Sequence, residues 1–313
     1  MSLLTGAKQG SKPGPSKWIR AALWIAVAVA AAAAVVLVAK WARSLEPVQE
    51  FLAAYPGHSD RPENTPVGLP AWVNWQHFLN AFFIVLIIRS GWQIRATARP
   101  KAYWTRNNTG LIRTKAKPAK ISLELWFHLC LDVLWLLNGL VFVVLLFISG
   151  HWMRIVPTSW DVFPNALSTA LQYASLDWPT ENGWIHYNAL QVLSYFAVVF
   201  IAAPLAALTG MRMSPIWPKG NSALERAFPM ALARRVHFPV MLFFVAFVVT
   251  HVVLVLSTGA LRNLNHMFAA RDDGGWLGFG IFALSVAVTA GAWLLAKPVF
   301  LRPVAGLMGK VSR

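Results

Sequence analysis

Six long apolar runs alternate with polar segments along the chain. A helix needs about 20 predominantly apolar residues to cross the hydrocarbon core of a bilayer, and each run is near or above that length. The pattern therefore predicts six membrane-spanning helices, over residues 21–39, 72–94, 123–149, 184–209, 236–258 and 276–296. With 57% hydrophobic and 13% charged residues, the composition is typical of an all-α membrane protein and excludes a soluble globule.

The polar segments indicate how the chain is oriented. Lys and Arg accumulate on the cytoplasmic side of a membrane. With the N-terminus inside, the inner segments hold 22 of the 28 Lys and Arg residues, and the outer loops hold nine of the 12 Asp and Glu residues. Both termini are then cytoplasmic. The net charge of +16 reports this topology, so we expect no nucleic-acid partner.

The ends of the runs carry turn signals. A basic tail precedes the first run, which is also the pattern of a cleaved signal peptide; the length favours a retained span, and cleavage stays open as the alternative. The loop at 151–183 is rich in Trp, Pro and Asp and is expected to be a structured surface element. Four runs end in a hydroxyl residue followed by glycine, and we expect each glycine to cap its helix in a left-handed conformation: Gly91, Gly150, Gly210 and Gly259.

Four histidines lie inside the predicted spans, and their depths match in pairs. His237 and His251 are 14 residues apart, close to four helical turns, so they share one helix face about 21 Å apart. His77 lies at the outer level of His251, and His128 lies at the inner level of His237. Neutral imidazole binds haem iron axially, so the pairs predict two haems stacked across the membrane. The alternative is four interfacial histidines without a cofactor.

The stretches around these histidines resemble the bacterial di-haem cytochrome b subunits that serve nickel-iron hydrogenases, formate dehydrogenases and thiosulfate reductases. They read WQHFLNAFFIVLIIRSGWQI, LWFHLCLDVLWLLNGLVFVV and RVHFPVMLFFVAFVVTHVVLVLSTG. The resemblance implies that the four histidines are the axial ligands of two b-type haems, His77 with His251 and His128 with His237. It also implies a multi-pass protein of the bacterial cytoplasmic membrane.

The resemblance covers residues 71–260, which we expect to form a central four-helix di-haem bundle. The chain departs from the simplest members by an added span at each end and by its long third loop. It therefore divides into a basic cytoplasmic tail (1–20), an extra span with an outer segment (21–70), the bundle, and an outer loop with a sixth span and a basic tail (261–313).

The implied function is electron transfer across the membrane, between a quinone pool and a partner oxidoreductase on the outer side, where acidic loops offer a docking surface. The stretch RIVPTSWDVFPNALSTALQYASLDWPTENGW is similar to actinobacterial members found with molybdopterin oxidoreductases. The competing function is a non-redox transporter or anchor subunit without haem, in which the histidines serve packing or proton movement.

Ionisable residues near the inner surface suggest how protons and charge are handled. Glu124 and Asp132 share a helix face with His128, and Arg89 lies at a similar depth. One hypothesis is that Arg89 neutralises a haem propionate, while Glu124 or Asp132 relays protons to a quinone beside the inner haem. The alternative is an Arg89–Asp132 ion pair, with Glu124 placed favourably at a helix N-terminus.

Other polar residues receive weaker assignments. His151 and His186 could bind a third cofactor or flank a quinone, although interfacial roles are more common. Asn188 and Gln191 form a second, weaker candidate for a quinone site. Cys130 is the single cysteine, so an intrachain disulfide and a cysteine-ligated cluster are excluded. Without a Cys-x-x-Cys-His motif any haem is held non-covalently, and without a Gly-rich dinucleotide fingerprint electrons must come from or go to another protein.

Overall fold

The structure is a computed structural model that describes residues 16–109, 117–178, 182–218, 220 and 222–313. Within these residues it contains six helices that are long and apolar enough to cross a membrane. They are α1 (Lys17–Arg43), α3 (Ala71–Ala96), α4 (Leu123–Ile148), the helix Ala189–Met213, α9 (Met230–Ser257) and α11 (Leu277–Leu295). The prediction of an all-α protein with six spans is confirmed.

The fourth span begins five residues later than predicted because its N-terminus is capped at Asn188. The Asn188 side chain accepts a hydrogen bond from the Gln191 backbone (2.8 Å), and the Gln191 side chain accepts one from the Asn188 backbone (3.0 Å). This capping box satisfies two helix donors. The span consists of α6 (Ala189–Phe196), a π-helical segment η2 (Ala197–Ala202) and α7 (Ala203–Met213).

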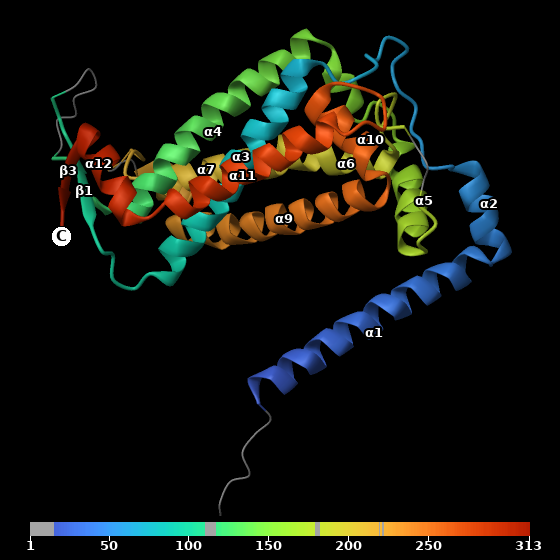
Figure 1. Cartoon of the computed structure of the whole chain (residues 1–313), viewed down its shortest axis with the longest axis horizontal. Helices are drawn as coiled ribbons and strands as arrows, with labels where there is room; N and C mark the ends of the chain where they lie inside the picture. Colours follow the sequence, from blue (N-terminus) through green and yellow to red (C-terminus); the bar gives the residue numbers. More distant parts are fainter. Residues whose placement is uncertain (1–15, 110–116, 179–181, 219, 221) are drawn as a thin grey trace, which may run out of the picture.

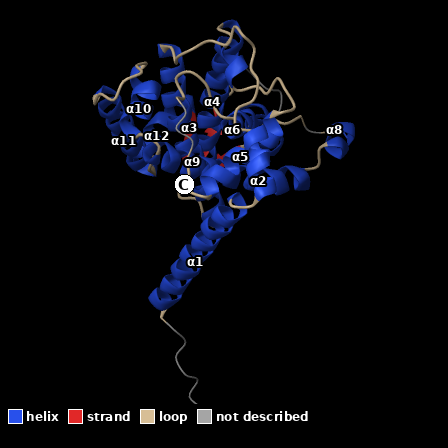
Figure 2. Cartoon of the chain, turned by 90° about the vertical axis from the view of Figure 1, so that its right-hand side faces the viewer, coloured by secondary structure: helices blue, strands red, loops and turns tan. Residues whose placement is uncertain are grey.

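Helices α3, α4, α7 and α9 form the centre of the bundle, with α3 packed on α4 and α7 packed on α9. Helix α11 lies against α3. Helix α1 extends away from the bundle (Figures 1 and 2). At its C-terminal end, Arg43 donates hydrogen bonds to Ser175 and Asp177, which tie it to the segment after α5 (Val162–Ala174).

One end of the bundle, called the loop end below, carries the long connections. It contains α2 (Glu46–Ala54), a 3₁₀ helix η1 (His151–Arg154), α5, α10 (Ala260–Leu264) and a π-helical segment η3 (Asn265–Ala269). The described part of the loop at 151–183, residues 151–178 and 182–183, is structured, as predicted. Arg154 is buried and donates hydrogen bonds to the carbonyls of Pro66, Gly183 and Trp184, which hold this loop against the preceding segment.

The opposite end, called the basic end below, carries a small sheet that the hydrophobic pattern did not predict. Three antiparallel strands pair in the order β2-β1-β3, and α12 (Pro298–Met308) packs against β3. Helix α8 (Ser222–Ala227) stands apart, in the connection between α7 and α9 (Figure 2). The strands are β1 (Tyr103–Arg106), β2 (Lys120–Ser122) and β3 (Gly309–Ser312). Asn107, Asn108 and Gly110 predict a turn in the basic loop; the chain turns at Asn108 and Thr109, and Gly110 lies outside the described residues.

The prediction of glycine caps is half right. Gly150 has φ +74° and Gly259 has φ +121°, so both adopt the positive φ that favours glycine. Gly91 and Gly210 do not end their helices, because α3 continues to Ala96 and α7 continues to Met213. Their surroundings, described next, give a different reason for glycine.

Candidate functional site

The four histidines of the spans form two pairs at opposite ends of the bundle. His77 on α3 and His251 on α9 lie at the loop end, with ring centroids 6.2 Å apart. His128 on α4 and His237 on α9 lie at the basic end and line one cavity. The structure thus brings together the two pairs that the depths predicted, and α9 contributes one member to each.

Aromatic side chains surround the loop-end pair. Phe247 stacks on the His251 ring at 5.6 Å with an interplanar angle of 4°, and Tyr195 approaches the same ring edge-on at 6.3 Å. Phe268 meets the His77 ring edge-on at 5.4 Å. The Nδ1 atom of His77 is buried and has no hydrogen-bond partner among the described residues. These contacts fix both rings in an apolar environment.

The separation of the loop-end rings suits a shared metal. A metal–imidazole bond is about 2.0–2.1 Å long, so two nitrogens on opposite sides of one metal lie roughly 4 Å apart. The ring centroids lie somewhat further apart than the nitrogens, which is compatible with the 6.2 Å between His77 and His251.

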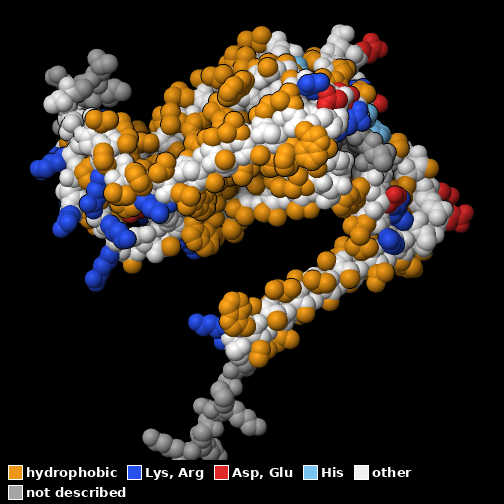
Figure 3. Space-filling view, viewed as in Figure 1, with side chains coloured by type: hydrophobic (Ala, Val, Ile, Leu, Met, Phe, Trp, Pro, Cys, Tyr) orange, Lys and Arg blue, Asp and Glu red, His pale blue; other side chains and the backbone are white. Residues whose placement is uncertain are grey.

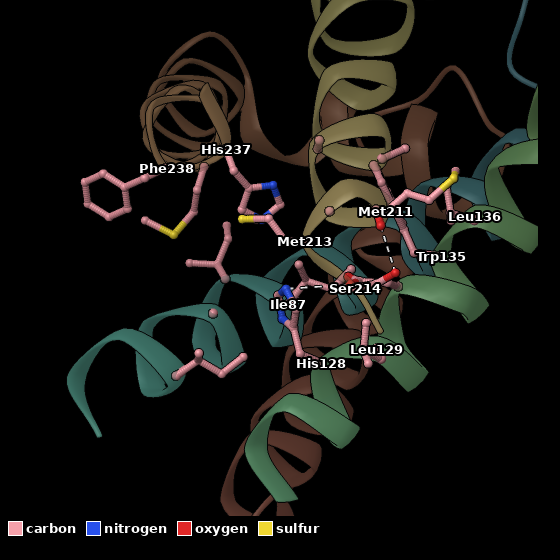
Figure 4. Close-up of a pocket in the computed structure, with 18 of the residues that line it drawn as sticks. Ile87, His128, Leu129, Trp135, Leu136, Met211, Met213, Ser214, His237 and Phe238 are labelled. Atoms are coloured by element: carbon pink, nitrogen blue, oxygen red, sulfur yellow. Dashed lines mark hydrogen bonds and ion pairs between the residues drawn. The ribbon is translucent and has the colours of Figure 1, made fainter. Parts of the chain in front are cut away.

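The cavity at the basic end has a volume of about 420 Å³ and a mostly apolar lining. This volume lies within the range of cofactor pockets, roughly 300–1,000 Å³. His128 and His237 reach it from different helices, α4 and α9 (Figure 4). Trp135 and Phe244 also line it, with ring centroids 6.4 Å apart. The cavity can therefore hold a flat apolar group between two imidazoles.

A hydroxyl of a neighbouring helix fixes the ring of His128. Ser90 Oγ lies 2.8 Å from His128 Nδ1 and also donates a hydrogen bond to the Ile87 carbonyl at 3.0 Å. A hydroxyl has one hydrogen, and the carbonyl takes it. We therefore assign His128 as an Nδ1–H donor to Ser90, the tautomer that leaves Nε2 with a free lone pair.

The same arrangement recurs on the other side of the cavity. Thr209 Oγ1 lies 2.8 Å from His237 Nδ1 and donates to the Leu205 carbonyl at 2.6 Å. His237 is therefore also an Nδ1–H donor with its Nε2 lone pair free.

Gly91 and Gly210, each next to one of these hydroxyl residues, leave room for the rings. A Cβ built on Gly91 would lie 3.4 Å from His128 Cε1, and one on Gly210 would lie 3.5 Å from His237 Cε1. A methyl group would touch the imidazole, and a longer side chain would occupy its place. Close approach of an imidazole, rather than a helix cap, accounts for these two glycines.

The three ionisable residues predicted near the inner surface occupy different places in the structure. Asp132 lines the cavity, with Oδ2 3.6 Å from His128 Nε2. Glu124 lies in the first turn of α4, and its Oε2 is buried without a hydrogen-bond partner in the described part of the chain. No ion pair joins Arg89 to Asp132 among the described residues.

Arg89 instead holds the end of α11. Its guanidinium donates to the Gln93 side chain (3.0 Å) and to the Ala296 carbonyl (2.9 Å), and it lies 5.2 Å from the Trp293 ring centroid. It satisfies a free carbonyl at a helix C-terminus and is not among the residues that line the cavity.

Two arginines that line the cavity were not predicted as site residues from the sequence. Arg95 and Arg234 line the cavity and are exposed, and the Arg95 guanidinium lies 4.1 Å from the Phe238 ring centroid. Arg95 lies at the end of α3, which carries His77, and Arg234 lies one turn before His237 on α9; a basic residue at the end of a histidine-bearing span is the signal that could have identified them. They were counted only as topology-setting charges.

A second, more polar cavity of about 320 Å³ lies at the loop end. His58 and His186 meet there edge-on at 4.8 Å, beside Arg61 and Arg154. Burial and the neighbouring Arg61 lower the pKa of His58, and burial followed by the charge of His58 lowers the pKa of His186. Both rings are therefore mainly neutral at pH 7.

The remaining candidates have structural contacts. His151 meets Trp72 edge-on at 5.5 Å. Asn188 and Gln191 cap α6 with each other's side chains, as described above. In the described residues no group of three or more His, Cys, Asp or Glu residues is placed to hold a metal ion.

The position of His266 in an outer loop of the sequence predicts a solvated side chain, but the structure buries it. It is 4% exposed, and its Nε2 lies 2.7 Å from Asp272. Asp272 also accepts from Arg262 at 2.7 Å, and these bonds hold the pKa of Asp272 well below its usual range.

Comparisons with known proteins relate the chain to membrane cytochromes. A family model described as prokaryotic cytochrome b561 matches residues 68–270, which include all four span histidines. A relative from Azospira oryzae is 29% identical over 200 residues, covering 59% of this chain and 88% of its own length. It carries the provisional name protein-methionine-sulfoxide reductase subunit YedZ1. No solved structure gives a significant match.

Proposed function

Because the chain belongs to the prokaryotic cytochrome b561 family of membrane haem proteins, we propose that it carries electrons through two b-type haems. One haem is held by His77 and His251, and the other by His128 and His237. The electrons pass between a quinone pool and a partner oxidoreductase. The observation that carries this proposal is the presence of one histidine pair at each end of the bundle, with α9 supplying a member of each.

The side chains at both sites fit the group. A b-type haem is held only by axial ligands and packing. At the basic end the Nε2 lone pairs of His128 and His237 are free, and the cavity between them is mostly apolar. At the loop end the rings of His77 and His251 are separated by a distance compatible with one metal. Arg95 and Arg234 at the cavity are better placed than Arg89 to meet propionate groups.

When bound, haem supplies reversible one-electron transfer at its iron. The chain's own contribution is to hold the two sites about four helical turns apart on α9, roughly 21 Å along the axis. Phe244 lies midway between His237 and His251 on that helix and is 6% exposed. It packs against Trp135. An aromatic pair thus lies between the two sites.

We place quinone exchange at the basic end, where Asp132 lines the cavity beside His128. Asp132 can accept or donate a proton as the quinone changes its redox state. Glu124, about two turns earlier on α4, would pass that proton to the surface. We assign the basic end to the cytoplasm of a bacterial cell, because Lys and Arg gather there (Figure 3).

The partner would then dock at the loop end, where acidic side chains gather (Figure 3). The name of the Azospira oryzae relative, a subunit of a protein-methionine-sulfoxide reductase, favours a reductase as partner. The resemblance of the loop at 151–183 to chains found with molybdopterin oxidoreductases favours a molybdopterin enzyme.

A pyridine haemochrome assay on the full-length protein, expressed with haem available, tests the proposal. We expect b-type absorbance equivalent to two haems per chain. A matched His58→Ala variant, changed at a histidine outside the two pairs, should keep both haems. Absence of b-type absorbance would instead support a transporter or anchor subunit without haem.

A further inference from the structure

The two histidine pairs differ in the hydrogen bonds that their rings make. At the basic end both Nδ1–H groups donate to hydroxyl oxygens, from Ser90 and Thr209. At the loop end the Nδ1 of His77 is buried without a partner among the described residues, and aromatic rings surround the pair. If these histidines bind haem as proposed above, the two haems have unequal ligands.

This difference acts on the reduction potential. An acceptor at Nδ1–H makes the imidazole a more basic ligand, which stabilises ferric iron relative to ferrous iron and lowers the potential. An apolar environment without such an acceptor disfavours the extra positive charge of ferric iron and raises the potential. Both effects separate the sites in the same direction.

Charged groups near the basic end shift the reduction potential of the basic-end haem in opposite directions. Asp132 lies 3.6 Å from His128 Nε2, and a carboxylate there would also favour ferric iron. Arg95 and Arg234 would favour ferrous iron, but both are exposed, so solvent screens them. The hydroxyls lie 2.8 Å and the carboxylate 3.6 Å from imidazole nitrogens of the pair.

We infer that Ser90 and Thr209 make the basic-end haem the lower-potential member of the pair, so that electrons pass from the basic end to the loop end. The haem that His128 and His237 would hold would, once reduced, give one electron to the oxidised haem that His77 and His251 would hold. No proton moves, because each imidazole keeps its Nδ1–H. A quinol at the basic end supplies the electrons and releases its two protons there. An oxidising partner enzyme at the loop end takes up the electrons.

The surroundings of the Ser90 and Thr209 hydroxyls support a specific role in holding the two imidazoles. Each hydroxyl residue precedes a glycine that faces the same imidazole, Ser90 with Gly91 and Thr209 with Gly210. Each hydroxyl also bonds to a carbonyl three or four residues earlier in its own helix, which fixes its lone pairs toward the ring. Two different helices therefore present the same acceptor to the two ligands of one site.

Optical redox titration of the purified full-length protein tests this inference. The wild type should show two b-type steps. Ser90→Ala and Thr209→Val should move the lower step to higher potential and leave the upper step in place, with both haems retained by haemochrome assay. Thr209→Ser keeps the hydroxyl and should restore the wild-type lower step. Electron paramagnetic resonance should show altered g values for one ferric haem in the Ala and Val variants.

Ser285→Ala is the matched control, because Ser285 makes the same back-bond to a helix carbonyl, Ile281, at 2.8 Å without an imidazole. It should change neither step. If two haems bind and Ser90→Ala and Thr209→Val leave both steps unchanged, or move the upper one, the inference is overturned while the proposed function stands. If Thr209→Val loses a haem, the redox titration of Ser90→Ala alone tests the inference. A wild type without haem would overturn the proposed function itself.

Discussion

Each proposed haem ligand depends on side chains from a helix other than its own. His128 on α4 receives its hydroxyl from α3, and His237 on α9 receives its hydroxyl from α7. At the loop end the corresponding contacts are aromatic and include Phe268 of η3. A ligand therefore cannot be changed without affecting the packing between two helices, and the effect should remain at its own end of the bundle.

The four histidines should separate into two groups when they are replaced singly. We expect His77→Ala and His251→Ala to lose one haem, and His128→Ala and His237→Ala to lose the other, because one axial ligand is removed in each case. Haemochrome content and redox titration would identify which step disappears. Any grouping other than these two would refute the pairing.

Asp132 should matter for turnover and not for haem binding. We expect Asp132→Asn to slow quinone reduction and quinol oxidation about 10²-fold or more, the usual effect of losing a general acid–base group, with haem spectra intact. Glu225→Gln, which changes an exposed carboxylate on α8, is the control and should keep the wild-type rate. Unchanged turnover in Asp132→Asn would remove the relay.

At the scale of helices and strands, Gly91 on α3 and Gly210 on α7 allow each helix to lie close to an imidazole of the basic-end site. We expect Gly210→Leu to lose the basic-end haem and keep the loop-end haem, because a side chain there would fill the space beside His237. Gly210→Ala should be milder, since its methyl group would only touch the ring. Gly139→Leu on α4 is the control, because no atom lies within 4 Å of its Cβ position. Equal haem loss in both leucine variants would show that general packing, and not the site, is affected.

The segment between α10 and α11 should have a pH-dependent stability. The pKa of Asp272 is lowered by Arg262 and then by His266. A lowered pKa in the folded state contributes stability above the unfolded value, about 3.9, and this contribution is lost as the pH falls through the folded value. Asp272→Asn should therefore reduce the melting temperature at pH 7, measured in detergent.

The difference from wild type in that experiment should disappear in acid. Asp177→Asn, which removes a more exposed carboxylate paired with Arg43, gives the comparison and should have a smaller effect. A difference for Asp272→Asn that persists unchanged at low pH would contradict the ion-pair explanation.

The same elements show what the sequence could and could not predict. Length and hydropathy located the spans, because the bilayer imposes both. The start of α6 was misplaced because a local capping box at Asn188 outweighed the apolar residues before it. The sheet was missed because β1 pairs with β3, about 200 residues away, and no local pattern encodes that pairing. Ser90 and Thr209 were visible as a repeated hydroxyl–glycine pair, but their target was not, since it lies on another helix.

At the scale of the whole molecule, charge divides the chain into two ends. The space-filling view shows Lys and Arg at the end that carries β1 and α12, and Asp and Glu at the end that carries α2 and α5 (Figure 3). A membrane protein with this asymmetry is expected to keep its basic end in the cytoplasm. The direction inferred for the electrons then runs from the cytoplasm to the outside, toward the acidic docking surface.

Cysteine labelling in intact cells would test this orientation. The chain has a single cysteine, Cys130, inside α4, so Cys130→Ala gives a background without thiols. Glu63→Cys introduces a thiol at the loop end, and Glu225→Cys introduces one on α8 at the basic end; both positions are exposed glutamates. A membrane-impermeant maleimide should label the first in intact cells and the second only after permeabilisation. The opposite result would reverse the positive-inside assignment, and the partner would then have to be sought in the cytoplasm. Because the order of potentials is set within the bundle, the electrons would still run from the basic end to the loop end, now inward.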